Sequence, residues 1–175
     1  MQNLTLTNLV FAALILVWVV RRQLAARVIR FKINAYLIII LIGIFSISDA
    51  FNKQHLTITP VQALLFGGAS LLSALLFGAL RAWSYHFWVN DEGLVMRQGT
   101  WLTLLFWIVG TGGHLLVERL WTGSAVTLTL YLGITLLIQR GGVWWLARRA
   151  YPTELAANLA AQNQRHDRHS HRSKN

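Results

Sequence analysis

The residues of this chain best suited to chemistry are the few ionisable side chains inside long apolar stretches. His114 and Glu118 stand four residues apart, which places them on one face of a helix, and Arg119 follows directly. A histidine and a carboxylate at this spacing can share a proton or ligate a metal. A metal needs further ligands, and the same side offers only His55 and Asp49. An ion pair that stabilises the helix end is the simpler interpretation.

Asp49 is the second candidate, at the end of another apolar stretch. Lys53 follows one turn later, in the order that favours a helical ion pair. A solvated pair at the rim of a helix explains both residues. The alternative is a proton or cation site between Asp49 and the pair of His114 and Glu118. With Arg119, these residues form the candidate intramembrane polar site.

The rest of the sequence offers little for an enzyme or a cofactor. The chain has no cysteine, which excludes disulfides, thiol exchange, covalent haem attachment and cysteine-bound zinc. It also lacks a phosphate loop, a dinucleotide fingerprint, an HExxH helix and a nucleophile motif. Three histidines in the basic tail form either a weak metal-binding tract or part of a flexible cationic end: His166, His169 and His171. We expect no enzymatic activity, no cofactor and no metal.

Long apolar stretches must position the candidate residues. The 175 residues are 55% hydrophobic and 13% charged, whereas a soluble domain carries about 25% charged residues. Each stretch can cross a hydrocarbon core about 30 Å thick. We expect an all-α integral membrane protein, a single transmembrane domain over residues 1–150 with a five-helix bundle at about 4–20, 33–50, 60–80, 100–121 and 122–140.

Local features refine these boundaries. Thr59 and Pro60 are a suitable N-cap and first residue for the third helix. Trp101 and Trp121 are spaced for the two interfaces of one crossing, roughly 30 Å apart at 1.5 Å per residue. The fifth stretch is rich in threonines, whose hydroxyls must bond carbonyls or neighbouring helices in lipid: Thr122, Thr127, Thr129 and Thr135. It either crosses the membrane or forms a re-entrant hairpin with the fourth.

Small residues cluster in the third and fourth stretches. They include Gly67, Gly68, Gly78, Gly110, Gly112 and Gly113. Small residues permit close helix packing, which is the interpretation we favour. A broken-helix substrate site over residues 110–113 is the alternative.

The basic residues predict the orientation. Of the 16 lysines and arginines, all but Lys53 and Arg119 lie in residues 21–32, 81–97 and 140–174. The positive-inside rule places these three segments in the cytoplasm, with the amino terminus outside and the carboxyl terminus inside. Trp144 and Trp145 are expected to anchor the cytoplasmic interface, and anionic headgroups rather than nucleic acid are the expected partner of the charge.

The predicted cytoplasmic segments are expected to have different structures. Residues 21–32 have an apolar face and are expected to extend a helix along the headgroups, or to dock a partner. Residues 83–98 alternate with period two and predict a β-hairpin with a four-residue turn and Gly93 in a left-handed conformation. The hairpin rests on the membrane or offers an edge to a partner. Gly141 and Gly142 are expected to end helix five, and residues 151–175 to form a basic tail, helical over 154–161 and then disordered.

Residues 60–140 resemble the CcdC-like family of small bacterial membrane proteins, named for its association with cytochrome c biogenesis. The similarity lies in a glycine-rich crossing that ends at Arg81, an aromatic strand with the acidic turn Asp91-Glu92-Gly93, and a strand with Arg97. The junction at residues 99–103 and a crossing with Trp107 follow. The resemblance implies a helper role near haem or thiol chemistry, which would be indirect because the chain has no cysteine.

Three hypotheses about function follow. The first is a non-enzymatic accessory or regulatory inner-membrane protein that acts through a membrane-protein partner or self-association. The second is a small oligomeric transporter or channel for a proton, cation or small solute, with Asp49, His114 and Glu118 near its path. The third is a membrane enzyme with a metal near His114.

Overall fold

The computed structural model describes residues 17, 20, 21, 23–30, 33–54, 59–122 and 126–172. The predicted first crossing, residues 4–20, therefore lies outside the described residues apart from Val17 and Val20. The helices are α2 (Asn34–Gln54), α3 (Pro60–Trp83), α4 (Trp101–Thr122), α5 (Leu128–Ala150) and α6 (Pro152–Arg172). The strands are β1 (Arg27–Val28), β2 (His86–Val89) and β3 (Val95–Gln98). The described chain is thus mostly helical, as predicted.

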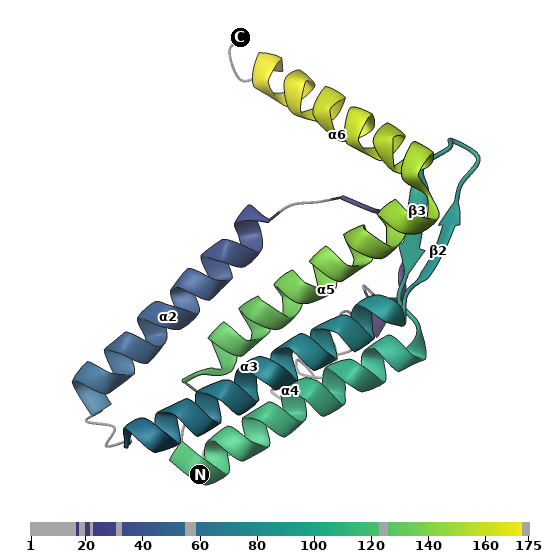
Figure 1. The fold of residues 1–175 in the computed structure, drawn as a ribbon. Coiled ribbons are helices and arrows are strands. Elements are labelled where there is room, and N and C mark those ends of the chain that lie inside the picture. Colours follow the sequence, from purple (N-terminus) through teal and green to yellow (C-terminus); the bar gives the residue numbers. More distant parts are fainter. Residues whose placement is uncertain are drawn as a thin grey trace.

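Helices α2 to α5 run alternately up and down as a bundle, while the sheet and α6 gather at one end of it (Figure 1). Helix α5 packs against both α2 and α3, and α4 packs mainly on α3. The end with the sheet, called the sheet end below, contains the end of α3 and the start of α4. The opposite end, called the far end, contains the end of α4 and the start of α5.

Three of the described helices are long and apolar enough to cross a membrane: α2 over Asn34–Asn52, α3 over Pro60–Trp83 and α4 over Trp101–Arg119. Their outer faces carry large apolar side chains that the protein does not cover, such as Phe45 at 73%, Leu64 at 77% and Ile108 at 69% exposure. Apolar surface on this scale suits contact with lipid.

Helix α5 lies at the centre of the bundle. Buried residues recur along its length, from Tyr131 to Ala147. Because its neighbours are helices, α5 can carry threonines, Gln139 and Arg140 without meeting the apolar composition of α2, α3 and α4. The predicted stop at Gly141 and Gly142 is wrong, since α5 continues to Ala150. Gly142 serves packing instead: a Cβ there would lie 2.7 Å from the Cβ of Ala82 on α3.

The small residues divide into two groups. Packing explains Gly78 and Gly110, whose added Cβ atoms would come within 2.9 Å of Ile138 and 2.7 Å of Phe77. It does not explain four others, which have open space around them: Gly67, Gly68, Gly112 and Gly113. Helix α4 runs unbroken from Trp101 to Thr122, so the structure has no broken helix at residues 110–113.

The predicted hairpin is confirmed. Strands β2 and β3 pair antiparallel with Val89 opposite Val95. The N–H of Gly93 donates to the carbonyl of Asn90 at 2.9 Å, and Gly93 has φ 72°. A turn followed by a left-handed glycine is a common three-residue hairpin connection.

Strand β1 was not predicted. It pairs antiparallel with β3, which gives a three-stranded sheet in the order β1-β3-β2. A continuous helical extension over residues 21–32 is therefore wrong for Arg27 and Val28. The apolar spacing suited a helix, but hydrogen bonds to the free edge of β3 decide the conformation instead.

Helix α6 covers the sheet through a small core. This core joins β1 and β3 to the ends of α3, α5 and α6 through Ile29, Ala82, Tyr85, Val95, Val143, Ala147 and Leu155. Asn158 on α6 is 3% exposed and bonds three backbone groups: its amide donates to the carbonyls of Ile29 at 3.2 Å and Val95 at 3.0 Å, and its oxygen accepts from Val95 N–H at 2.9 Å. Helix α6 also extends to Arg172, well past the predicted end at residue 161.

Candidate functional site

A cavity of about 240 Å³ lies toward the far end of the bundle, where α2, α3, α4 and α5 all contribute to its wall. Most of the wall is apolar, with Ile47 and Phe51 from α2 and Phe66 from α3. Five residues bring polar groups to it: Ser70, His114, Glu118, Thr127 and Tyr131. The volume exceeds that of a cavity that binds benzene, about 150 Å³. The site can therefore enclose a small organic molecule.

Glu118 and His114 are the ionisable groups of the cavity. The Glu118 side chain is 0% exposed and the His114 side chain 2%. The His114 Nε2 lies 3.7 Å from the Glu118 Oε2. The other carboxylate oxygen accepts a hydrogen bond from the backbone N–H of Thr127, just before α5 begins. Glu118 thereby joins the end of α4 to the start of α5.

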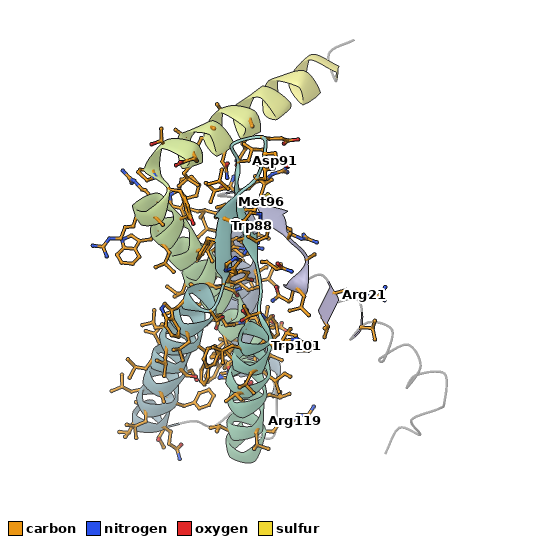
Figure 2. All side chains as sticks on the ribbon, turned by 90° about the vertical axis from the view of Figure 1, so that its right-hand side faces the viewer. Arg21, Trp88, Asp91, Met96, Trp101 and Arg119 are labelled. Atoms are coloured by element: carbon orange, nitrogen blue, oxygen red, sulfur yellow. The ribbon has the colours of Figure 1, made fainter. Side chains whose placement is uncertain are left out.

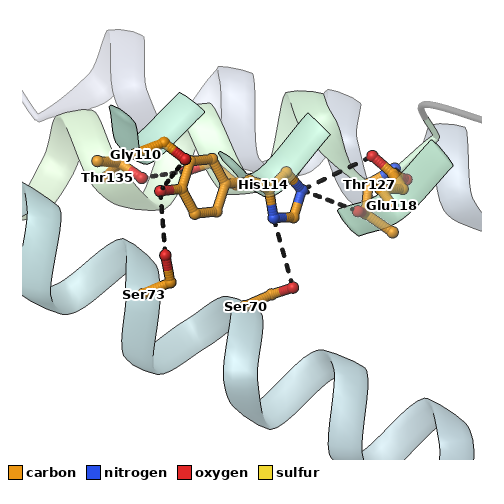
Figure 3. A network of polar contacts seen from close by, with 8 residues as sticks. Ser70, Ser73, Gly110, His114, Glu118, Thr127 and Thr135 are labelled. Carbon is orange, nitrogen blue, oxygen red and sulfur yellow. Dashed lines mark hydrogen bonds and ion pairs between the residues drawn. The ribbon is translucent and has the colours of Figure 1, made fainter. Parts of the chain in front are cut away.

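Both ring nitrogens and one face of the His114 imidazole have contacts. Its Nε2 lies 3.2 Å from the Thr127 hydroxyl and its Nδ1 lies 3.5 Å from the Ser70 hydroxyl (Figure 3). The imidazole stacks on the Tyr131 ring at 4.0 Å and 8°. A neutral imidazole with its proton on Nε2 satisfies these contacts, because Nδ1 then accepts from Ser70 and Nε2 donates toward Thr127 or Glu118.

Tyr131 continues the network toward the middle of the bundle. Its hydroxyl donates to the carbonyl of Gly110 at 3.0 Å and lies 3.4 Å from the Ser73 hydroxyl. The Thr135 hydroxyl donates to the carbonyl of Tyr131 at 2.6 Å. The expectation that threonine hydroxyls of this helix bond backbone carbonyls or other helices is thus confirmed for Thr135 and Thr127.

The remaining candidate residues lie away from the cavity. Asp49 and Arg119 are exposed and do not line it, and Figure 2 shows Arg119 at the far end of α4. His55 and the side chain of Lys53 lie outside the described residues. The structure therefore brings together His114 and Glu118 but leaves Asp49 and Arg119 outside the site.

The predicted tryptophan anchors can be placed in part. Trp101 is 74% exposed where α4 meets the sheet (Figure 2). Trp145 is 53% exposed, whereas Trp144 packs against the core beneath the sheet. The side chain of Trp121 lies outside the described residues. Trp83, which was not among the predicted anchors, is 69% exposed.

A metal does not suit the cavity. Within the part of the chain that the structure describes, no three histidine, cysteine or acidic residues are grouped as metal ligands. One carboxylate and one imidazole leave a zinc or calcium ion short of donors. The arrangement instead suits proton exchange, or an ion pair with an organic cation.

A second buried polar cluster lies at the sheet end. Arg81 is 1% exposed, donates from Nε to the Phe77 carbonyl at 3.1 Å and places its guanidinium 5.2 Å from the Trp107 ring. Arg97 lies 5.0 Å from the Tyr85 ring. Burial raises the pKa of Tyr85, whose hydroxyl accepts a hydrogen bond from Gln139 at 2.8 Å. This cluster ties α3, α5 and the sheet together.

Sequence reasoning missed Tyr131 and Ser70. A visible pattern marks the first: Thr127, Tyr131, Thr135 and Gln139 recur every four residues along α5, so they share one face of the helix. A polar stripe of this kind in an apolar stretch indicates a face turned toward protein. No comparable pattern marks Ser70, which is one of several small residues on α3.

Comparison with known proteins does not identify the chain. No protein-family model matches it, and no curated protein or solved structure is significantly similar to it. The resemblance to the CcdC-like family therefore stays a prediction, and function has to be argued from the site.

Proposed function

We propose that this chain is a small membrane transporter that binds a solute in the cavity of Glu118 and His114. The observation that carries the proposal is the fully buried Glu118 side chain in the wall of a 240 Å³ cavity. An acidic group among membrane-length helices is costly and is typical of substrate and proton pathways. Helix–helix hydrogen bonds alone would need only neutral groups, such as Ser73 and Thr135.

The membrane arrangement is part of the proposal. Helices α2, α3 and α4 meet the length and composition of crossings, and central α5 crosses among them as the fourth. The sequence predicts a fifth crossing at residues 4–20, which lie almost entirely outside the described residues. The sheet end faces the cytoplasm of a bacterial cell membrane, because the basic segments around Arg27, Arg97 and Arg148 lie there. The cavity then lies nearer the outer side.

The absence of cysteine allows a direct test of access to the cavity. We would introduce Ser70→Cys in membrane vesicles and measure its reaction with a membrane-impermeant thiol reagent added from each side. Ser70 lines the cavity, so the thiol should react from at least one side. Leu72→Cys is the matched control, since Leu72 is 69% exposed on the outer face of α3 and should be shielded by lipid. Equal, low reactivity of both thiols would refute a solute site.

Flux is the second test. In proteoliposomes, Glu118→Gln and His114→Gln should each change the flux of protons or of small organic cations. Glu92→Gln, at the exposed hairpin turn, is the control and should leave the flux unaltered. Unchanged flux in both cavity variants would rule out transport through this site.

A second candidate function is the accessory role through partner contacts. Strand β2 lies at the edge of the sheet, and an edge strand can pair with a strand of another protein. Cross-linking in native membranes, followed by mass spectrometry, tests this role. A stoichiometric partner linked to residues 81–99 would favour it, and recovery of only self-linked protein would argue against it.

A further inference from the structure

We infer that the ligand of the cavity is a small organic monocation with an apolar body, such as a quaternary ammonium or a hydrophobic amine. This inference rests on the proposed solute site and names the chemistry that the site selects. It depends on three properties of the wall: its charge, its aromatic surface and its size.

The ionisable groups of the wall favour a cation. Among the described residues that line the cavity, Glu118 is the carboxylate and there is neither lysine nor arginine. His114 is satisfied as a neutral imidazole by Ser70 and Thr127. Arg119, the nearest basic residue along α4, is exposed and does not line the cavity. A carboxylate in a surrounding of low dielectric attracts a cation strongly and repels an anion.

The surface of the wall favours an organic cation over a hydrated ion. Phe51, Phe66 and Tyr131 line the cavity, and the face of an aromatic ring attracts an ammonium group. The His114 and Tyr131 rings stack face to face at 4.0 Å, so each ring keeps only its outer face for contact with a ligand. An alkali or alkaline-earth ion would need about six oxygen ligands, and this wall supplies mostly carbon.

The size of the cavity sets an upper limit on the ligand. A volume of 240 Å³ holds a cation of about the size of a single ring with a trimethylammonium group. A ligand of this kind fills the apolar space and places its charge against Glu118. Desolvation of the cation is then offset by the carboxylate and the rings.

The experiment uses three probes of nearly equal shape and different charge: phenyltrimethylammonium, tert-butylbenzene and benzenesulfonate. Binding to the purified full chain in detergent is measured by calorimetry and corrected against detergent alone. We expect saturable binding of phenyltrimethylammonium, at least about tenfold tighter than tert-butylbenzene, and no binding of benzenesulfonate. Glu118→Gln should lower the affinity for the cation at least about tenfold. Its affinity for tert-butylbenzene should be kept, which shows that the cavity is intact.

The outcomes separate this inference from the proposed function. If tert-butylbenzene binds as tightly as the cation, or if Glu118→Gln leaves cation affinity unchanged, the monocation inference is overturned while the solute site stands. If none of the probes binds and Ser70→Cys is unreactive, the solute site itself fails. Preferential binding of benzenesulfonate would overturn the charge argument.

Discussion

Asn158 gives the sharpest test of how the sheet end is held together. Its side chain makes three hydrogen bonds to backbone groups of Ile29 and Val95, and it is 3% exposed. Asn158→Ala removes all three bonds. Each buried hydrogen bond contributes about 1 kcal/mol, so we expect α6 to lose about 3 kcal/mol of its attachment to the sheet. The Val95 carbonyl keeps one hydrogen bond in this variant, because it also accepts from Ile29 N–H at 3.1 Å.

A cysteine probe measures this loss locally. Leu155 lies on the buried face of α6 and is 3% exposed. The thiol of Leu155→Cys therefore reacts only when α6 lifts from the sheet. A loss of about 3 kcal/mol should raise the labelling rate roughly 100-fold when Asn158→Ala is added to the Leu155→Cys protein. Thr153→Ala, at an exposed position of α6, is the control and should leave the rate unchanged.

Asn158→Asp extends the test with almost no change of shape. At neutral pH the carboxylate faces the carbonyls of Ile29 and Val95, so attachment should be weaker than in Asn158→Ala. These carbonyls raise the pKa of the new carboxyl in the folded state, so attachment should recover as pH falls through that raised pKa. An increase in labelling below about fivefold in both variants would refute the claim that Asn158 fastens α6.

Two further predictions concern the packing of the bundle and the stability of the protein at alkaline pH. Gly43→Ala would place a Cβ 2.5 Å from the backbone nitrogen of Leu130, so it should destabilise the protein by about 1–3 kcal/mol. Gly112→Ala, with nothing within 4 Å of the added Cβ, should stabilise the protein by up to about 1 kcal/mol. If the two variants shift the melting temperature in the same direction, the packing of α2 on α5 is contradicted. Burial raises the pKa of Tyr85, so the folded protein holds this proton more tightly than the unfolded chain, and stability should fall as pH rises above about 10. Melting curves should show that Tyr85→Phe reduces this fall; an equally steep fall in the Tyr85 variant would contradict the assignment.

Local features of the fold could be predicted from the sequence. The start of α3 is confirmed, with a capping box between Thr59 and Gln62 and Pro60 in the first turn. The turn at Gly93 is confirmed as well. In both cases neighbouring residues determine the conformation, so a short window of sequence contains the cause.

The features that were missed depend on distant residues. Strand β1 is two residues long and exists because β3, far along the chain, has an edge for it. Helix α5 continues through Gly142, and the close approach of Ala82 of α3 explains the glycine there. Neither cause is visible in the local sequence, where periodicity indicated a helix in the first case and a pair of glycines indicated a helix end in the second.

The site was predictable only along α4. A spacing of four residues put His114 and Glu118 on one face, and the structure has them 3.7 Å apart. The groups that complete the cavity come from other helices, chiefly Tyr131 of α5 and Ser70 of α3. Asp49 was grouped with the pair because it was expected at the same membrane side, but it does not line the cavity. The role of the pair in transport stays a prediction.

The central place of α5 has a consequence for biosynthesis. Helix α2 packs mainly on α5, yet the ribosome completes α3, α4 and the hairpin before α5 emerges. During those seconds, at about 5–20 residues per second, the face of α2 that packs on α5 lacks this partner. Helix α3 must likewise keep open the face that α5 will occupy. The arrival of α5, with its polar stripe already inside the nascent bundle, is therefore the step that closes the assembly.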